Sequence, residues 1–173
     1  MKKLIECVPN FSEGRNLEII KQITDEITRV DGVTLLDVDP GGATNRTVVT
    51  FVGEPEAVIE AAVLAGHKSK QLIDMSNHSG EHPRFGAMDV CPLVPISGVS
   101  MDETVEYARR LAKRLGDEVG LSIYCYENAA LVDERRNLAV VRAGEYEALA
   151  TRLQDERWAP DFGPTDFQAS TGA

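Results

Sequence analysis

The sequence lacks the long apolar runs and the export signal that mark membrane and secreted proteins. No apolar stretch among its 173 residues approaches the ~20 residues that a membrane-spanning helix needs. The N-terminus begins with two lysines, as a signal peptide does, but Glu6, Pro9 and Asn10 interrupt its apolar stretch at once. These absences predict a cytoplasmic protein.

Cysteine and positive charge are also scarce. The three cysteines, Cys7, Cys91 and Cys125, form no CxxC pair, and each lies in an apolar, strand-like stretch. We therefore expect buried thiols in a reducing compartment. Acidic residues outnumber basic residues by 28 to 18. Because phosphate neutralisation is the main source of affinity for nucleic acids, this balance argues against nucleic-acid binding.

Hydrophobic periodicity predicts an α+β fold. The predicted strands cover residues 2–9, two runs within 33–53, 88–98 and 121–130, and the predicted helices cover 17–30, 54–74, 101–115 and 144–158. Asn16 is a predicted N-cap, and Pro55 occupies the first turn of its helix. This order contains a ferredoxin-like split βαββαβ unit with an additional helix and strand. We expect an α/β sandwich in which helices cover one face of a mixed sheet.

The last residues differ from the rest in composition. Residues 1–157 are predicted to form the folded subdomain, whereas residues 158–173 form a tail rich in glycine, proline and small polar side chains. One interpretation of the tail is a disordered linker. The other is a glycine-bearing loop that folds over a flat ligand, with Phe162 and Phe167 available for stacking.

Polar residues gather in four segments. These segments are Asn10–Arg15, Asp37–Arg46, His78–Asp89 and Gly163–Gly172. The first three follow a strand, link two strands or precede one, and loops at sheet ends frequently carry function. Each segment contains glycine, which lets a backbone approach a ligand closely. Together they suggest a composite site.

The segment HSGEHPRFGAMD, residues 78–89, raises the question of a metal site. His78 and His82 have the HxxxH spacing of metal-binding helices, but Gly80 and Pro83 argue against a helix. Three aspartates are available as further ligands: Asp37, Asp39 and Asp89. No spacing singles one of them out, so we predict that the segment holds no metal.

Acid–base chemistry suits the same segment better. Histidine both takes and returns a proton near neutral pH, and a residue before proline is confined to extended conformations. Arg84, two residues after His82, has the planar donors that hold a carboxylate. The alternative is that His78 and His82 only cap strand ends or bond the loop. Two histidines in a Gly/Pro loop beside Arg84 favour a functional role.

Three stretches resemble the N-terminal subdomain of glutamate formiminotransferase, an enzyme of histidine degradation. They are VPNFSEGRN, DVDPGGATNRTVVTFVG and HSGEHPRFGAMDVCPLVP, and the resemblance covers essentially the whole chain. In some organisms the family is fused to formiminotetrahydrofolate cyclodeaminase. The resemblance implies transfer of the formimino group from N-formimino-L-glutamate to N5 of tetrahydrofolate, the co-substrate, without a metal. It also implies a cytoplasmic and typically dimeric enzyme.

The resemblance also implies roles for single residues. His82, in the HPR motif, is the expected catalytic histidine, acting first as general base and then as general acid. The expected folate-binding segment is Gly163, Pro164, Thr165, Asp166, Phe167, Gln168, Ala169, Ser170, Thr171 and Gly172. The chemistry of the implied substrates, rather than the resemblance itself, suggests candidate substrate-binding residues: Asn10, Asp39, Arg46, His78 and Arg84. Among them, Asp39 would orient the cationic formimino group, Arg46 and Arg84 would hold carboxylates, and Asn10 would supply an amide.

The family continues into a C-terminal subdomain that forms the other wall of the folate groove. We therefore expect this chain to need that subdomain as a partner, or a second copy in a homodimer, and to be weak or inactive alone. The alternative function is a non-catalytic folate-binding or partner-binding module of the same fold. A more distant alternative is a metal-dependent hydrolase that uses His78 and His82.

Overall fold

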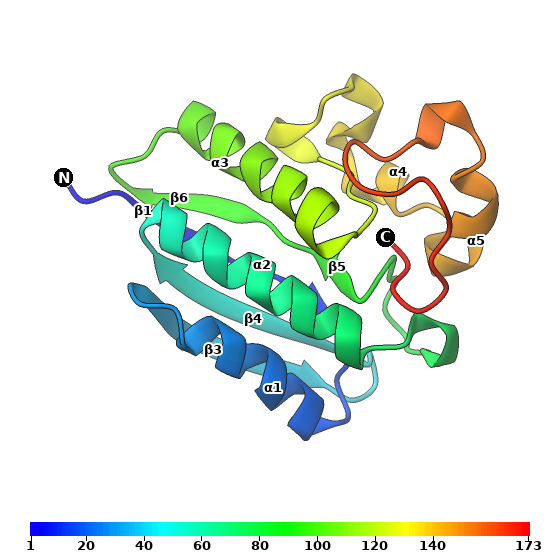
Figure 1. Cartoon of the computed structure of the whole chain (residues 1–173), viewed down its shortest axis with the longest axis horizontal. Helices are drawn as coiled ribbons and strands as arrows, with labels where there is room; N and C mark the ends of the chain where they lie inside the picture. The colour runs from blue at the N-terminus through cyan, green and yellow to red at the C-terminus, as the bar shows by residue number, and fades with distance from the viewer.

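Six strands form one strongly curled sheet in the computed structural model, which describes residues 1–173 (Figure 1). They are β1 (Leu4–Cys7), β2 (Asn10–Phe11), β3 (Val33–Gly41), β4 (Arg46–Gly53), β5 (Met88–Val90) and β6 (Leu93–Ser97). Strand β4 pairs with β1, β2 and β3, while β1 pairs with β6 and β2 with β5. Every pairing is antiparallel, so the predicted α+β class is confirmed and the predicted mixed sheet is wrong.

The mixed sheet was wrong because strands joined through a helix are not neighbours in the sheet: β4 separates β3 from β1 and β2, and β2 separates β4 from β5. In addition, the predicted strand at 121–130 does not join the sheet. That segment makes a single isolated bridge, between Ile123 and Phe162. Strands β1 and β2 lie end to end along β4, with Ile5 opposite Gly53 and Phe11 opposite Thr47. The six strands therefore occupy four positions across the sheet. Strand β3 runs in the same direction as β1, with β4 between them, as a split βαβ arrangement requires.

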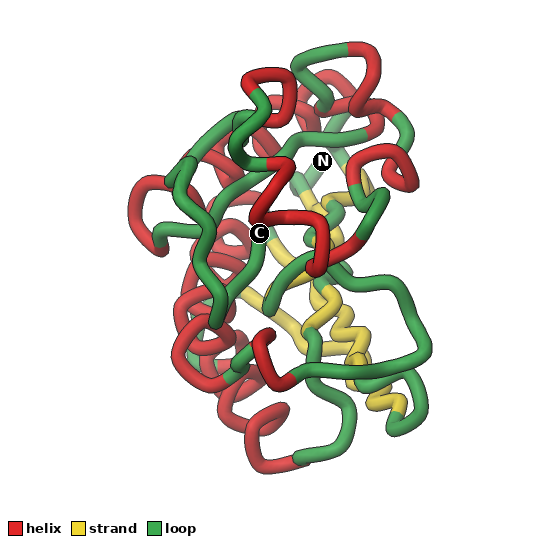
Figure 2. Tube along the Cα trace, turned by 90° about the vertical axis from the view of Figure 1, so that its right-hand side faces the viewer, coloured by secondary structure: helices red, strands yellow, loops and turns green.

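The helices lie on one side of this sheet and beyond its β5 end (Figure 1). The main ones are α1 (Leu17–Thr28), α2 (Pro55–Leu72), α3 (Met101–Arg114), α4 (Leu138–Val141) and α5 (Glu145–Arg152). Short turns are η1 (Met75–Asn77), the π-type η2 (Leu115–Val119), η3 (Glu127–Ala129), η4 (Asp133–Arg136) and η5 (Glu156–Trp158). Helices α1, α2 and α3 cover one face, and the strands lie on the other side of the molecule (Figures 1 and 2). None of the helices combines the length and the apolar character that a bilayer crossing requires.

The core lies between the sheet and these helices. Along β4, Val49 and Phe51 are completely buried, whereas the alternating Val48 and Val52 are only half-buried. Because successive strand residues point to opposite faces, Val49 and Phe51 point toward the helices and Val48 and Val52 away from them. The second face of the sheet therefore stays open for polar side chains.

The cysteines fall in or beside this core. Cys7 and Cys125 are buried, as predicted, and Cys91 is half-buried with its sulfur 3.5 Å from that of Cys7. Burial raises the pKa of the Cys125 thiol to about 11. At neutral pH this thiol is therefore protonated, which is the unreactive form.

The tail, residues 158–173, packs on the body of the protein. The amide of Met75 donates to the Ser170 carbonyl at 2.8 Å, and the amide of Ala87 donates to the Thr171 carbonyl at 2.8 Å. Gly86 lies directly against the end of the tail, where any Cβ atom would overlap the Ala173 carbonyl. The tail thus does not extend away as a linker, although the boundary after residue 157 stays a prediction.

Helix α1 begins where the sequence predicted, and this beginning is testable. The Asn16 side chain accepts hydrogen bonds from the amides of Glu18 and Ile19. Replacing Asn16 by alanine leaves these amides without a protein partner and should lower the free energy of unfolding by about 1 kcal/mol. Urea unfolding measures this change. Asn16→Asp, which keeps a capping oxygen, should stay near wild type, and an equal loss in both variants would contradict the cap.

Candidate active site

The predicted substrate residues Asn10 and Asp39 lie in one row across the open face of the sheet. Asp39 is opposite Val48, Val48 is opposite Asn10, and Asn10 is opposite Val90. Because Val48 points away from the helices, its partners in the row do so as well. Asp39 and Asn10 are two strands apart, so roughly 10 Å separates them. The structure therefore places both on one face.

Arg46, the first residue of β4, joins this row to the segment His78–Asp89, called the histidine segment below. Its Nε donates to Oδ1 of Asn10 at 2.7 Å, and its Nη1 lies 3.2 Å from Nδ1 of His82. Nη1 also donates to the Asp89 carboxylate and to the Pro83 carbonyl. Its second amino group, Nη2, makes no hydrogen bond within the protein and is not enclosed. Arg46 therefore keeps one amino group, with two N–H donors, free for a ligand.

His82 has one ring nitrogen occupied and one free. Its Nδ1 lies 2.7 Å from the Pro83 carbonyl oxygen, which only accepts hydrogen bonds. We therefore assign the proton of the neutral ring to Nδ1, since Arg46 Nη1 already has Asp89 and Pro83 as acceptors. Nε2 then carries the lone pair and has no protein partner. This is the tautomer that a general base at Nε2 requires.

Asp89 is a fully buried carboxylate below this pair. Its Oδ2 accepts from Arg46 and, at 2.8 Å, from Arg142, and its Oδ1 accepts from the Phe85 amide at 2.6 Å. Burial lowers the pKa of the Arg46 guanidinium, and the charge of Asp89 opposes that shift. From the sequence we considered Asp89 only as a metal ligand, and we did not identify Arg142 as its partner. A charge inside an apolar strand was the available signal, because a buried carboxylate needs a partner.

Asn45 connects three of the four polar segments, and sequence reasoning missed it. Its Oδ1 accepts from the Gly14 amide at 3.0 Å, and its Nδ2 donates to the Ser79 carbonyl at 3.0 Å. Its own carbonyl lies 2.8 Å from Nε2 of His78. Asn45 is buried and has a φ of 50°. Asparagine is one of the few residues that adopt this left-handed conformation readily, which was the available signal.

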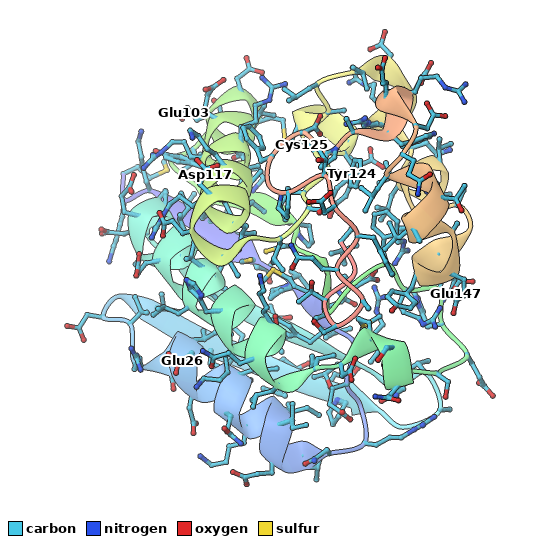
Figure 3. All side chains as sticks on the ribbon, turned by 45° about the vertical axis from the view of Figure 1, so that its right-hand side comes forward. Glu26, Glu103, Asp117, Tyr124, Cys125 and Glu147 are labelled. Carbon is cyan, nitrogen blue, oxygen red and sulfur yellow. The ribbon has the colours of Figure 1, made fainter.

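His78 and Arg84 hold each other and the fold. Since Nε2 of His78 donates to Asn45, its Nδ1 is an acceptor, and Arg84 Nε donates to it at 3.2 Å. The other nitrogens of Arg84 donate to Glu147 at 2.6 and 2.8 Å and to Glu145 at 3.3 Å. Glu147 is labelled on α5 in Figure 3. Arg84 holds the pKa of the Glu147 carboxyl below its usual range. Arg84 must therefore release a glutamate before it can bind a substrate carboxylate.

The predicted folate-binding segment meets the histidine segment at one end only. Thr171 and Gly172 are buried beside Phe85 and Gly86, directly after the HPR motif. At the other end, the Pro164 carbonyl accepts from the hydroxyl of Ser122 at 2.7 Å, toward α3. Between the ends, Thr165, Asp166 and Phe167 are exposed. The structure thus brings all four polar segments together, the fourth through its last residues.

Two further features lie near these residues. No three His, Cys, Asp or Glu side chains are grouped so that they could hold a metal ion. A cavity of about 300 Å³, mostly apolar, lies between α3, β6 and the segment after α3, and Asp89 and Arg142 contribute to its wall. His82 and Arg46 are not among its lining residues. The cavity therefore adjoins the predicted site through Asp89 and Arg142, without reaching His82 or Arg46.

Comparison with known proteins shows what these motifs belong to. Residues 4–173 match the family described as the formiminotransferase domain, N-terminal subdomain. The chain belongs to the formiminotransferase family. It is 53% identical over 173 residues to the formimidoyltransferase-cyclodeaminase of Rattus norvegicus and 54% identical to that of Sus scrofa. The glutamate formimidoyltransferase of Streptococcus pyogenes serotype M1 is 42% identical over 172 residues.

This formiminotransferase subdomain corresponds to only part of its relatives. The two mammalian matches cover 100% of this chain and 32% of each relative. The streptococcal match covers 99% of this chain and 58% of that protein. The resemblance read from the three sequence motifs is therefore confirmed at the level of the family.

The role of Asn45 in the formiminotransferase subdomain gives a testable prediction. Asn45→Ala removes both side-chain hydrogen bonds and forces alanine into a left-handed conformation, and it should lower the free energy of unfolding by about 3 kcal/mol. Asn45→Gly removes the same bonds without the strain and should lose about 2 kcal/mol. Urea unfolding measures both variants. Wild-type stability in Asn45→Ala would contradict the proposed connection.

Proposed function

We propose that this chain transfers the formimino group from N-formimino-L-glutamate to N5 of tetrahydrofolate, as a glutamate formimidoyltransferase. The observation that carries the proposal is the free Nε2 of His82 on the open face of the sheet, beside the guanidinium of Arg46. His82 stands in the HPR motif that the resemblance assigned to the catalytic histidine. Tetrahydrofolate is the co-substrate, no metal is required, and we place the reaction in the cytoplasm.

The reaction needs one group that moves a proton twice. N5 of tetrahydrofolate attacks the formimino carbon, and a tetrahedral intermediate forms with a new N5–C bond. Nε2 of His82 accepts the proton that N5 loses. The bond between this carbon and the glutamate nitrogen then breaks, and His82 returns the proton to the departing amine. The products are 5-formiminotetrahydrofolate and glutamate, and the histidine regains its starting state.

The neighbouring residues divide the recognition of the donor between them. The formimino group is cationic, and the exposed carboxylate of Asp39 on the same sheet face would orient it. Nη2 of Arg46 is the free donor for a carboxylate of the glutamate moiety. Asn10 holds Arg46 in place, and His78 supports Arg84. Arg84 would take a second carboxylate in exchange for Glu147.

We place tetrahydrofolate along the segment Gly163–Gly172. In its exposed middle, the ring centroid of Phe167 lies 5.7 Å from that of Tyr146 at an interplanar angle of 48°, and the Phe167 ring offers an aromatic face for stacking. Its last residues lead to the HPR loop. Because the chain covers a third to somewhat more than half of its relatives, we propose that a C-terminal subdomain or a second copy supplies the opposite wall of the groove.

The test is formimino transfer measured with matched histidine variants. His82→Ala should lower the rate of 5-formiminotetrahydrofolate formation by about 10²- to 10⁴-fold, the usual contribution of a general acid–base residue. His67, a half-buried residue of α2 outside the predicted site, supplies the control. His67→Ala should keep the wild-type rate. Equal rates in His82→Ala and wild type would contradict the assignment.

Absence of transfer would separate the two candidate functions. In that case the assay is repeated with the C-terminal subdomain of the rat relative added in trans. Recovered transfer would establish a catalytic half that needs its partner. Tetrahydrofolate binding without recovered transfer would instead indicate the non-catalytic binding module, and no binding at all would leave only the fold.

A further inference from the structure

We infer that Asp89 is a positioning residue that fixes the tautomer of His82 by occupying the donor of Arg46. The inference rests on the proposed function for its catalytic meaning. Its structural content, which residue sets the position of the imidazole proton, stands on the contacts alone.

The backbone explains why a carboxylate reaches this place. In the pairing of β2 with β5, Phe11 is opposite Met88 and Asn10 is opposite Val90, so Asp89 is an extra residue in β5. A bulge of this kind breaks the alternation of side chains and redirects one of them. The redirected Asp89 side chain is fully buried and lies under Arg46. The bulge therefore delivers a charge to the base of the proposed site.

Arg46 Nη1 has more acceptors within reach than hydrogens to donate. Three acceptors lie near this nitrogen: the Asp89 carboxylate, the Pro83 carbonyl and Nδ1 of His82. Nη1 has two hydrogens. As long as Asp89 and Pro83 take them, Nδ1 need not accept and keeps its own proton for the Pro83 carbonyl at 2.7 Å. The lone pair then stays on Nε2.

Removing the charge of Asp89 should move the ring proton of His82 from Nδ1 to Nε2. An amide at position 89 that keeps its oxygen on the Phe85 amide turns its NH₂ group toward Arg46. Nη1 then has a hydrogen without an acceptor, and the ring nitrogen 3.2 Å away is the nearest one. Nδ1 accepts only if the ring proton moves to Nε2. In that tautomer Nε2 carries no lone pair for the N5 proton.

The negative charge of Asp89 also favours protonation of His82 during the reaction. When His82 takes a proton, an imidazolium forms beside the Arg46 guanidinium, and the two cations repel each other. Asp89 neutralises Arg46, while Arg142 shares the same carboxylate oxygen. Without Asp89, two arginines and an imidazolium would lie together with no carboxylate between them. Asp89 therefore supports both the starting tautomer and the charged intermediate.

Histidine ¹⁵N NMR of the 173-residue chain tests the inference without any need for activity. Wild type should show His82 protonated on Nδ1, and Asp89→Asn should show it protonated on Nε2. The double variant Arg46→Met, Asp89→Asn lacks the competing donor and should return to the Nδ1 form. An Nδ1 proton that persists in Asp89→Asn, or an Nε2 proton in wild type, would overturn the inference.

Kinetics supply the second measurement. Asp89→Asn should lower kcat for formimino transfer about 10- to 100-fold, because a misplaced catalytic group costs rate of this order. Arg142→Gln breaks the other ion pair of the same carboxylate but leaves Arg46 paired, so it should lose much less. Equal losses in the two variants, with an unchanged tautomer, would reduce Asp89 to a purely structural role and overturn the inference.

Two further outcomes stay interpretable. If Asp89→Asn does not fold, the double variant is compared with Arg46→Met alone, since replacing both charges avoids an unpaired buried arginine. Equal tautomers and equal kcat in these two variants are expected, and a further loss on removing Asp89 would contradict its action through Arg46. If wild type transfers no formimino group, the proposed function fails, but the NMR measurement still tests whether Asp89 sets the tautomer of His82.

Discussion

The carboxylate of Asp89 has no contact with solvent, and the arrangement of the site depends on how its charge is paired. A buried charge without partners costs several kcal/mol, so the surrounding chain must supply donors. It supplies Arg46 from β4, Arg142 from the turn after α4 and the amide of Phe85 from the histidine segment. One electrostatic requirement thus ties together a strand, a helical segment and the HPR loop, and it places Arg46 against His82.

The layering of the fold explains why this chemistry lies where it does. Helices α1, α2 and α3 bury one face of the sheet, which leaves the other face for Asn10, Asp39 and Arg46 (Figure 1). Segments that are far apart in the chain then meet at the end of that face, where the side chain of the buried Asn45 accepts a hydrogen bond from Gly14 and donates one to Ser79. The proposed reaction uses both properties, since an open face admits two substrates and fixed loops hold the base.

The sequence predicted the parts of the structure that depend on local rules. Helix α1 with its Asn16 cap and helix α2 with Pro55 in its first turn follow from periodicity and capping, which involve near neighbours. The predicted strand at 121–130 failed because strand-forming residues need a neighbouring strand, and only Phe162 pairs there. The roles of Asn45 and Arg142 were missed for a related reason, since their partners are 31 to 53 residues away in the chain.

The most direct test of this account is to titrate the ¹⁵N-labelled chain with tetrahydrofolate and follow its amide chemical shifts. We expect shifts at Asp39 and Val48 on the open face, in the loop around His82 and along Gly163–Gly172, with the amides of α1 unchanged. Shifts that spare both the loop around His82 and Gly163–Gly172, or none at saturating folate, would contradict a folate site that extends from this segment to His82.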